Sequence, residues 1–362
     1  MRVINYEQLK SILSHLSGTP RIVASGNFAA PKTLLKAADE SIESFKLNML
    51  NAHPGIPNRE GIEYETAFVG PAMRGNPRLA YIPSRLSMVP ILFRDHYRPD
   101  VVFLHTSPQR YDTVSLGIEV NVMPAAIEAA RARNGIVIAQ ANSQMPYTYG
   151  DSQIYENEID YLIEVDEPLL ENPVSQITEV QSEIGNRIAA LIENNSTLQL
   201  GIGGVPDAVL NALIDRKEMR IWTEMFSDGV LELHKVGALD TDMPLNASFI
   251  FGSRELYDWV DLNRFIHMRR TEVSNDPSLI QRQAKMTSIN SALQVDLYDQ
   301  ANASFVRGEI YSGFGGSTDF IVGSLHSRGG QSFMALPSWH PKADVSTIVP
   351  KLDTPVTSFQ HS

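Results

Sequence analysis

The stretch that decides the fold, residues 197–230, reads TLQLGIGGVPDAVLNALIDRKEMRIWTEMFSDGV. An apolar run ending at Leu200 is followed at once by glycines, and apolar residues then recur at helical spacing. A second apolar run ends just before Glu224. The pattern predicts a strand, a glycine loop, a helix and a second strand, with Pro206 at the first helical position, where its missing N–H costs nothing.

The glycine loop and Glu224 would both lie where parallel strands end, which is where open α/β sheets bind their ligands. Backbone N–H groups of Gly201–Val205 and of the helix start would face an anion such as a pyrophosphate. A carboxylate beside them could act as a nucleophile toward an activated acyl group. We therefore expect Gly201–Val205 and Glu224 to act together.

Two other interpretations of this loop stay open. Gly201 and Gly203 match the first two glycines of the dinucleotide fingerprint G-x-G-x-x-G, and Glu224 lies about where a ribose-binding acid would be. Pro206 replaces the third glycine, which weakens the interpretation that the chain is a nicotinamide-dependent oxidoreductase. The other interpretation is that the glycines only form a tight turn.

The composition of the 362 residues is that of a soluble globular protein, with 43% hydrophobic and 20% charged residues. The net charge of −12 argues against a nucleic-acid or anionic-membrane surface. The absence of cysteine excludes disulfides, thiolate catalysis and zinc–cysteine sites. No apolar run is long enough to span a membrane, and the first residues do not resemble a secretory signal. We expect a cytoplasmic protein.

A weak internal repeat suggests two domains. Gly26 lies five residues before Pro31, as Gly201 lies five before Pro206, and paired leucines follow in both. A helix is expected over residues 1–17, and strands alternating with helices in both halves indicate parallel sheets. The proline-containing segment 166–178 is the expected linker, which divides the chain into domains 1–178 and 179–362.

Further elements are expected along the chain, namely strands at 21–26, 101–104, 136–139, 159–165, 287–297 and 333–336 and helices at 124–134, 179–193, 254–260 and 277–285. A second glycine-rich loop, YSGFGGSTDF, covers residues 311–320.

Several common catalytic patterns are absent from the sequence. There is no GxSxG nucleophile elbow and no GxxxxGK[ST] phosphate loop. The nine histidines show no metal-ligand spacing, so we expect no metal site.

Five motifs together resemble the acetyl-CoA hydrolase/CoA-transferase family, and most of all its 4-hydroxybutyrate CoA-transferases. These motifs are MPYTYGDS, TLQLGIGGVPDAV, TEMFSDGV, SINSALQVDLYDQANA and YSGFGGSTDF, which cover nearly the whole chain. The resemblance implies two similar open α/β domains of the CoA-transferase (NagB/RpiA-like) type, with the active site between them. It also implies a homodimer or larger assembly.

The resemblance implies a covalent mechanism. Glu224 would attack an acyl-CoA thioester to give an acyl-glutamyl anhydride, and the CoA thiolate would return to give a glutamyl-CoA thioester. Asn275 would help the thioester carbonyl, and the N–H of Gly316 would serve the oxyanion. Coenzyme A would be the substrate cofactor, and the resemblance implies that it contacts Gly201, Ile202, Gly203, Gly204, Val205, Gly313 and Gly315.

The chain also departs from the family pattern. Many relatives carry a glutamate, a glycine and an acid where this chain has Gln294, Asp299 and Ser304. Relatives continue beyond residues 354–356, so the resemblance implies a second domain that is truncated at its C-terminus.

The predicted function is transfer of CoA between an acyl-CoA and a small carboxylate such as 4-hydroxybutyrate, acetate or butyrate. Two alternatives stay open: an acyl-CoA hydrolase, and a catalytically silent CoA-binding homologue. Asn142, Gln144, Met145 and Tyr147 are expected on the acyl side of the site.

Overall fold

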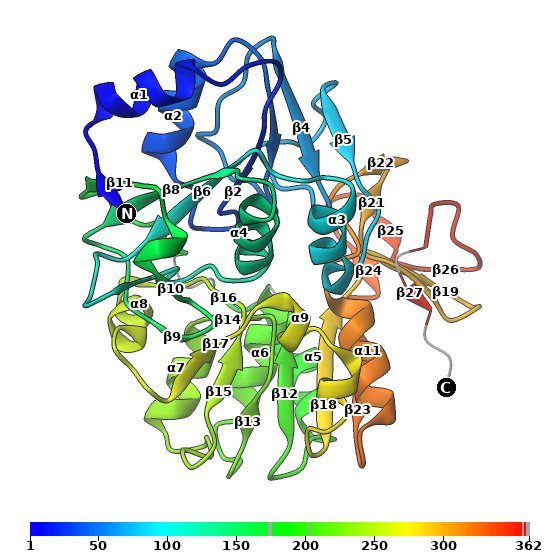
Figure 1. Cartoon of the computed structure of the whole chain (residues 1–362). Coiled ribbons are helices and arrows are strands. Elements are labelled where there is room, and N and C mark those ends of the chain that lie inside the picture. Colours follow the sequence, from blue (N-terminus) through cyan, green and yellow to red (C-terminus); the bar gives the residue numbers. More distant parts are fainter. Residues whose placement is uncertain (173–175, 202, 357, 360–362) are drawn as a thin grey trace.

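Two all-parallel sheets dominate the computed structural model, which describes residues 1–172, 176–201, 203–356 and 358–359. In Figure 1 the N-terminal half, blue to green, lies above the C-terminal half, and the last strands, in red, lie at one side. The α/β class with parallel sheets is therefore confirmed.

The N-terminal sheet has eight strands in the order β1-β11-β8-β6-β2-β3-β4-β5, and every neighbouring pair is parallel. Its strands are β1 (Arg2–Val3), β2 (Arg21–Ala24), β3 (Phe45–Asn48), β4 (Ile62–Thr66), β5 (Leu79–Tyr81), β6 (Val101–Thr106), β8 (Ile136–Asn142) and β11 (Tyr161–Val165). The helices of this half are α1 (Tyr6–Ser14), α2 (Lys32–Ser41), η1 (Leu86–Met88), α3 (Val89–Asp95), α4 (Met123–Arg131) and η2 (Glu156–Glu158).

Both faces of this sheet are buried, which explains why its strands are continuous apolar runs. Along β6, Val101 and Phe103 pack in a core with α1 and α2, while Val102 and Leu104 pack on the other face with α3 and α4. The start of α1 is fixed by a capping box in which Asn5 and Gln8 bond each other's backbone.

The C-terminal sheet has four parallel strands in the order β13-β12-β18-β23. They are β12 (Thr197–Leu200), β13 (Arg220–Ile221), β18 (Met286–Ser291) and β23 (Gln331–Ala335). The helices are α5 (Glu179–Ala189), α6 (Gly204–Ala212), α7 (Asp228–Lys235), α8 (Arg254–Val260), α9 (Thr271–Ser274), α10 (Pro277–Ile280) and α11 (Ser317–His326).

The remaining strands form small sheets. The two-stranded sheets are β7 (Thr113–Ser115) with β10 (Gln153–Tyr155), β14 (Met225–Phe226) with β16 (Phe249–Ile250), β21 (Phe305–Val306) with β22 (Glu309–Ile310), and β24 (Trp339–His340) with β25 (Val345–Ser346). One three-stranded sheet contains β15 (Leu245–Ala247), β17 (Ile266–Met268) and β9 (Tyr149–Gly150). One four-stranded sheet contains β26 (Ile348–Val349), β19 (Gln294–Asp296), β20 (Gln300–Asn302) and β27 (Ser358–Phe359).

The two halves are tied together by backbone as well as by packing. β9 from the N-terminal half pairs with β17 from the C-terminal half. The N–H groups of Val69 and Leu86 donate to carbonyls of the second glycine loop, at Ser312 (2.7 Å) and Gly315 (2.9 Å). One hydrophobic core, which includes Val23 and Leu198, runs through both halves. The predicted boundary at residue 178 stays a prediction, and part of the expected linker, 173–175, lies outside the described residues.

Some predicted elements differ from the observed ones. Pro206 is the third residue of α6 and not the first, a place that also suits it because the first four N–H groups of a helix have no partner within it. The strand predicted over 287–297 is divided into β18 and β19, and the helix predicted over 277–285 ends at Ile280. Four strands of two residues each follow β23, which was predicted as the last; β24 and β25 are exposed, and all four are too short to show an apolar run.

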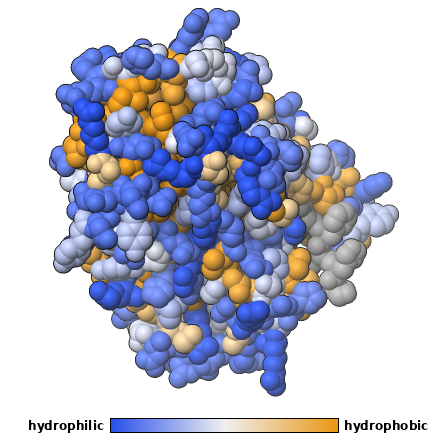
Figure 2. Space-filling view, viewed as in Figure 1, coloured by the Kyte–Doolittle hydropathy of each residue, from blue (hydrophilic) through white to orange (hydrophobic). Residues whose placement is uncertain are grey.

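Most of the face seen in Figure 2 is hydrophilic, with one larger apolar area over the N-terminal half. Among the described residues, no helix combines the length and apolar character that crossing a membrane requires.

Candidate active site

Glu224 is the last residue of the three-residue gap between β13 and β14, where the C-terminal sheet ends. Its carbonyl accepts hydrogen bonds from the N–H groups of Ser248 (2.8 Å) and Phe249 (2.9 Å). Thr223 is buried beside Glu224, and its Oγ1 accepts a hydrogen bond from the N–H of Leu200 (3.1 Å) at the end of β12. These bonds fix the backbone that presents the Glu224 side chain, which is half-buried and has little contact with bulk water.

Asn275 and Gly316 meet this side chain. The Nδ2 of Asn275 donates to Glu224 Oε2 at 3.1 Å, and Asn275 is fully buried. The Asn275 Oδ1 accepts from Ser274 Oγ (2.7 Å), which fixes the direction of the amide. Gly316 is the N-cap of α11, and a Cβ at this position would overlap both Glu224 Oε2 and Asn275 Nδ2. The structure therefore brings the three predicted catalytic residues into one cluster.

A cavity of about 250 Å³ opens in front of this cluster. It lies where the parallel strands β12, β18 and β23 end, as expected for a ligand site of an open α/β sheet. The lining comprises Gln199, Leu200 and Gly201 after β12, Asn290, Ser291 and Met334, the segment 312–317, and Phe68, Glu224, Met225, Phe249 and Ala303.

The predicted CoA-binding glycines divide into two groups. Gly201, Gly313 and Gly315 line this cavity with Gly316. Gly203, Gly204 and Val205 form the start of α6 and do not line it; Gly203 has a φ of 123° and open space around it. Ile202 lies outside the described residues. Contact of these residues with CoA stays a prediction.

Two further carboxyl groups lie close to Glu224 and were not predicted. Glu119 comes from the N-terminal half, is 1% exposed and accepts a hydrogen bond from Asn27 Nδ2 (2.8 Å). Asp319 lies in the first turn of α11, is fully buried, and accepts from Ser87 Oγ (2.8 Å) with Arg85 at 3.5 Å. A single acid among apolar neighbours gave no sequence signal at Glu119, whereas Asp319 belongs to the quoted second glycine loop.

Burial is the largest cause of the raised pKa values of all three carboxyl groups. It raises the pKa of Glu224 to about 7, an effect that the Asn275 hydrogen bond reduces and the Asp319 charge increases. It raises the pKa of Glu119 to about 8, reduced by Asn27 and increased by the Glu224 charge. It raises the pKa of Asp319 to about 6, against the lowering effect of Ser87 and Arg85. Neighbouring carboxyls with separated pKa values are typical of catalytic sites.

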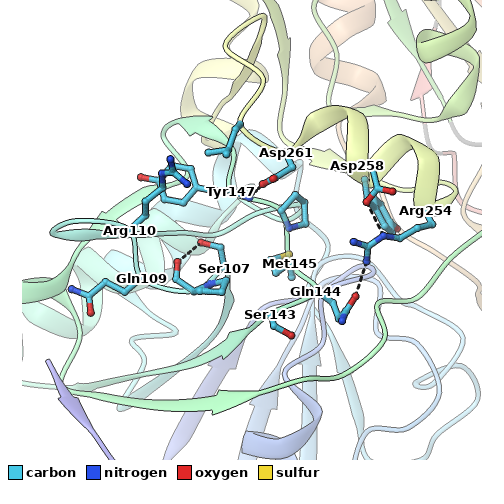
Figure 3. Close-up of a pocket in the computed structure, with 14 residues that line it drawn as sticks. Ser107, Gln109, Arg110, Ser143, Gln144, Met145, Tyr147, Arg254, Asp258 and Asp261 are labelled. Atoms are coloured by element: carbon cyan, nitrogen blue, oxygen red, sulfur yellow. Dashed lines mark hydrogen bonds and ion pairs between the residues drawn. The ribbon is translucent and has the colours of Figure 1, made fainter.

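A larger cavity, of about 400 Å³, lies elsewhere (Figure 3). Gln144, Met145 and Tyr147, which were expected on the acyl side, line this cavity and not the one at Glu224. Figure 3 shows Arg254 reaching both Gln144 (2.9 Å) and Asp258 (2.8 Å). The expected place of these residues and of Asn142 on the acyl side stays a prediction.

Among the described residues, no group of three or more potential ligands is placed to hold a metal ion.

Comparison with known proteins supports this geometry. Residues 252–362 match the model of the acetyl-CoA hydrolase/transferase C-terminal domain. The chain is 37% identical over 336 residues to 4-hydroxybutyrate coenzyme A transferase of Clostridium kluyveri, covering 89% of this chain and 77% of the relative. The chain belongs to the acetyl-CoA hydrolase/CoA-transferase family.

Other members of the acetyl-CoA hydrolase/CoA-transferase family agree in sequence and fold. A succinyl-CoA:acetate/propanoyl-CoA:succinate CoA transferase of Fasciola hepatica is 34% identical, over 90% of this chain and 72% of its own length. The crystal structure of RipA from Yersinia pestis superimposes with a TM-score of 0.92 at 27% identity, covering 99% of this chain and 86% of that one. The predicted family is thus confirmed, and with it the class of enzyme, a CoA-transferase.

Proposed function

We propose that this chain transfers CoA between an acyl-CoA and a small carboxylate, with Glu224 as the nucleophile. The observation that supports this most is the single cluster of Glu224, Asn275 and Gly316 at the end of a ligand-sized cavity. The names of the relatives favour short acyl groups and carboxylates, such as 4-hydroxybutyrate, acetate or butyrate.

The first step joins a Glu224 carboxylate oxygen to the acyl carbon and breaks the carbon–sulfur bond, so that the CoA thiolate leaves with the electron pair. The thiolate then attacks the Glu224 carbonyl carbon of the anhydride, which releases the first carboxylate and leaves a glutamyl-CoA thioester. An acceptor carboxylate repeats the two steps in reverse. Anhydride and thioester are both activated, so each exchange has a small free-energy change.

Each attack produces a negatively charged tetrahedral oxygen. The backbone N–H of Gly316, at the N-cap of α11, and the Asn275 amide are the donors placed beside Glu224. One such donor is worth about 3 kcal/mol of transition-state stabilisation. The raised pKa of Glu224, about 7, means that the nucleophile is ionised only near or above neutral pH.

A second candidate is an acyl-CoA hydrolase. A small cavity of about 40 Å³ lies on another side of Glu224 and is lined by Asn27, Asn51 and Asn121. A space of this size, which Leu50, Phe68, Leu86 and Phe249 also line, has room for water that could hydrogen-bond the amides and intercept the anhydride. Loss of acyl-CoA that does not depend on an added carboxylate would favour this candidate.

The deciding experiment is peptide mass spectrometry after mixing the protein with acetyl-CoA, butyryl-CoA or 4-hydroxybutyryl-CoA and trapping with hydroxylamine. We expect a hydroxamate on the peptide that holds Glu224, and none in Glu224→Gln, which should lose transfer by at least about 10³-fold. Glu232→Gln is the matched control, because Glu232 lies in α7 with its side chain 53% exposed. Unchanged transfer by Glu224→Gln would contradict the proposal.

The predicted homodimer is part of this proposal and can be tested by light scattering. Binding of CoA without modification of Glu224 or turnover of any of these thioesters would instead favour the silent CoA-binding homologue.

A further inference from the structure

Two carboxyl groups from different halves of the chain lie near the small cavity behind Glu224: Glu224 lines it, and Glu119 is linked to it through Asn27. Glu224 lines this cavity together with Asn27 and Asn121. Glu119 is held against it by its hydrogen bond from Asn27 and by a backbone bridge to Phe249, whose own N–H donates to the Glu224 carbonyl. Glu119 lies close enough for the Glu224 charge to act on it.

This pair of carboxyls has no cation between its members. The cavity lining contains no lysine, arginine or histidine among the described residues. Each carboxyl has one amide donor, Asn27 for Glu119 and Asn275 for Glu224. Two like charges this deeply buried, without a counter-ion, cannot both be accommodated, so one of the carboxyls keeps its proton.

The surroundings decide which carboxyl is charged. The N-cap of α11 and the Asn275 amide face Glu224, and helix N-termini stabilise negative charge. Among the described residues, the hydrogen-bond donor to Glu119 is the Asn27 amide, whose Oδ1 accepts from Asn51 Nδ2 (3.1 Å). Besides Glu224, the charged groups that act on the pair are Asp319, which acts on Glu224, and Arg85, which acts on Asp319.

We propose that Glu119 is a positioning residue that shares a single negative charge with Glu224, holding a proton while Glu224 is a carboxylate and releasing it when Glu224 becomes acylated. The proposal rests on the proposed function, since it requires Glu224 to lose its charge during the reaction. The proposal about Glu119 goes beyond the proposed function because it gives the N-terminal half a part in the chemistry.

The balance of the acylation step includes this proton. Acyl-CoA, the Glu224 carboxylate and the Glu119 acid give the acyl-glutamyl anhydride, the Glu119 carboxylate and neutral CoA thiol. The bond formed is between Glu224 oxygen and the acyl carbon, and the bond broken is carbon–sulfur. The proton that Glu119 releases is balanced by the proton that the CoA thiolate takes up, so Glu119 does not have to touch the sulfur. An ordinary thiol has a pKa of about 8.5, close to the value of about 8 for Glu119, so the proton can move in both directions.

The test is the pH dependence of kcat for acyl transfer. The rate should fall as the pH drops below about 7, where Glu224 becomes protonated, and fall again above about 8, where Glu119 ionises and places a second charge in the site. Glu119→Gln keeps the size and a hydrogen-bond donor but cannot ionise. We expect its rate at pH 7 to stay within about threefold of wild type, while the wild-type fall above pH 8 becomes shallower or disappears.

Glu65→Gln is the matched control. Glu65 is also a buried glutamate of the N-terminal half, at 4% exposure, but it pairs with Arg21 at 2.7 Å away from the site. This variant should keep the alkaline fall. The proposal is overturned if Glu119→Gln shows the same alkaline fall as wild type, or if it is folded but inactive at pH 7.

Infrared spectroscopy tests the protonation state without relying on activity. Wild type at pH 7 should show a protonated-carboxyl band that is weaker in Glu119→Gln, and an identical band in the two proteins would overturn the proposal. Failure of the proposed function would look different, because wild type itself would then form no hydroxamate at Glu224.

Discussion

The two strand–glycine–helix turns that look alike in sequence use their glycines differently. In the first, β2 leads through Gly26 to α2, and a Cβ at Gly26 would overlap the backbone carbonyl of Leu50. In the second, β12 leads through Gly203 to α6, and nothing lies within 4 Å of a Cβ at Gly203. The first turn needs its glycine for packing. The second turn is less crowded: at Gly201, the counterpart of Gly26, a Cβ would lie 3.3 Å from the Ile289 carbonyl oxygen, and the space at Gly203 is open.

This difference indicates how one βα unit can serve two purposes. The closed first turn places Asn27, with a φ of 46°, where its amide reaches Glu119. The open second turn leaves space above the ends of β12 and β18, beside Glu224. We infer that the first turn supports the site from behind while the second leaves room for a ligand.

The largest expected effect concerns a third glycine, Gly316, where packing and chemistry coincide. Gly316→Ala would push a methyl group against Glu224 Oε2 and Asn275 Nδ2. We expect transfer activity to fall by about 10³-fold or more, since both the nucleophile and an oxyanion donor are displaced. Steady-state kinetics on a variant whose circular dichroism matches wild type would measure this, and near-normal kcat would place the oxyanion donor elsewhere.

The comparison also shows what could be predicted from the sequence. The strands β6 and β8 and the helices α4, α5 and α8 follow from apolar periodicity, and they were found within a few residues. The short strands β24–β27 could not be predicted, because each has only two residues and so shows no apolar pattern, and β26 and β27 pair with the distant strands β19 and β20.

The residues of the site also divide into those that could be predicted from the sequence and those that could not. Glu224 and the second glycine loop could be identified from local motifs, and the structure adds that Asn275 bonds Glu224. Glu119 could not be identified, because its importance comes from the approach of the N-terminal half to Glu224, which no local spacing encodes.

A medium effect is expected in the first turn, on stability and not on chemistry. Gly26→Ala would overlap the Leu50 backbone, which cannot rotate away as a side chain could. Overpacking of this kind costs about 1–3 kcal/mol, and the free energy of unfolding from urea titration should fall by that amount. Gly18→Ala, at an open position with a φ of 70°, is the control and should cost about 1 kcal/mol through backbone strain alone. Equal losses in the two variants would show that packing at Gly26 is not special.

The smallest effect is expected in the second turn. Gly203 has a φ of 123°, so alanine there is strained, but no atom lies in the way of its methyl group. We expect Gly203→Ala to lose about 1–2 kcal/mol of stability and to raise the KM for acyl-CoA a few-fold with kcat unchanged, because the loop is proposed to bind the substrate's phosphates and not to take part in acyl exchange. Gly237→Ala, at another open position with a φ of 68°, should reproduce the stability loss without the KM change. A fall in kcat as large as that of Gly316→Ala would mean that the open turn closes onto Glu224 during catalysis, and the two turns would then differ in motion as well as in packing.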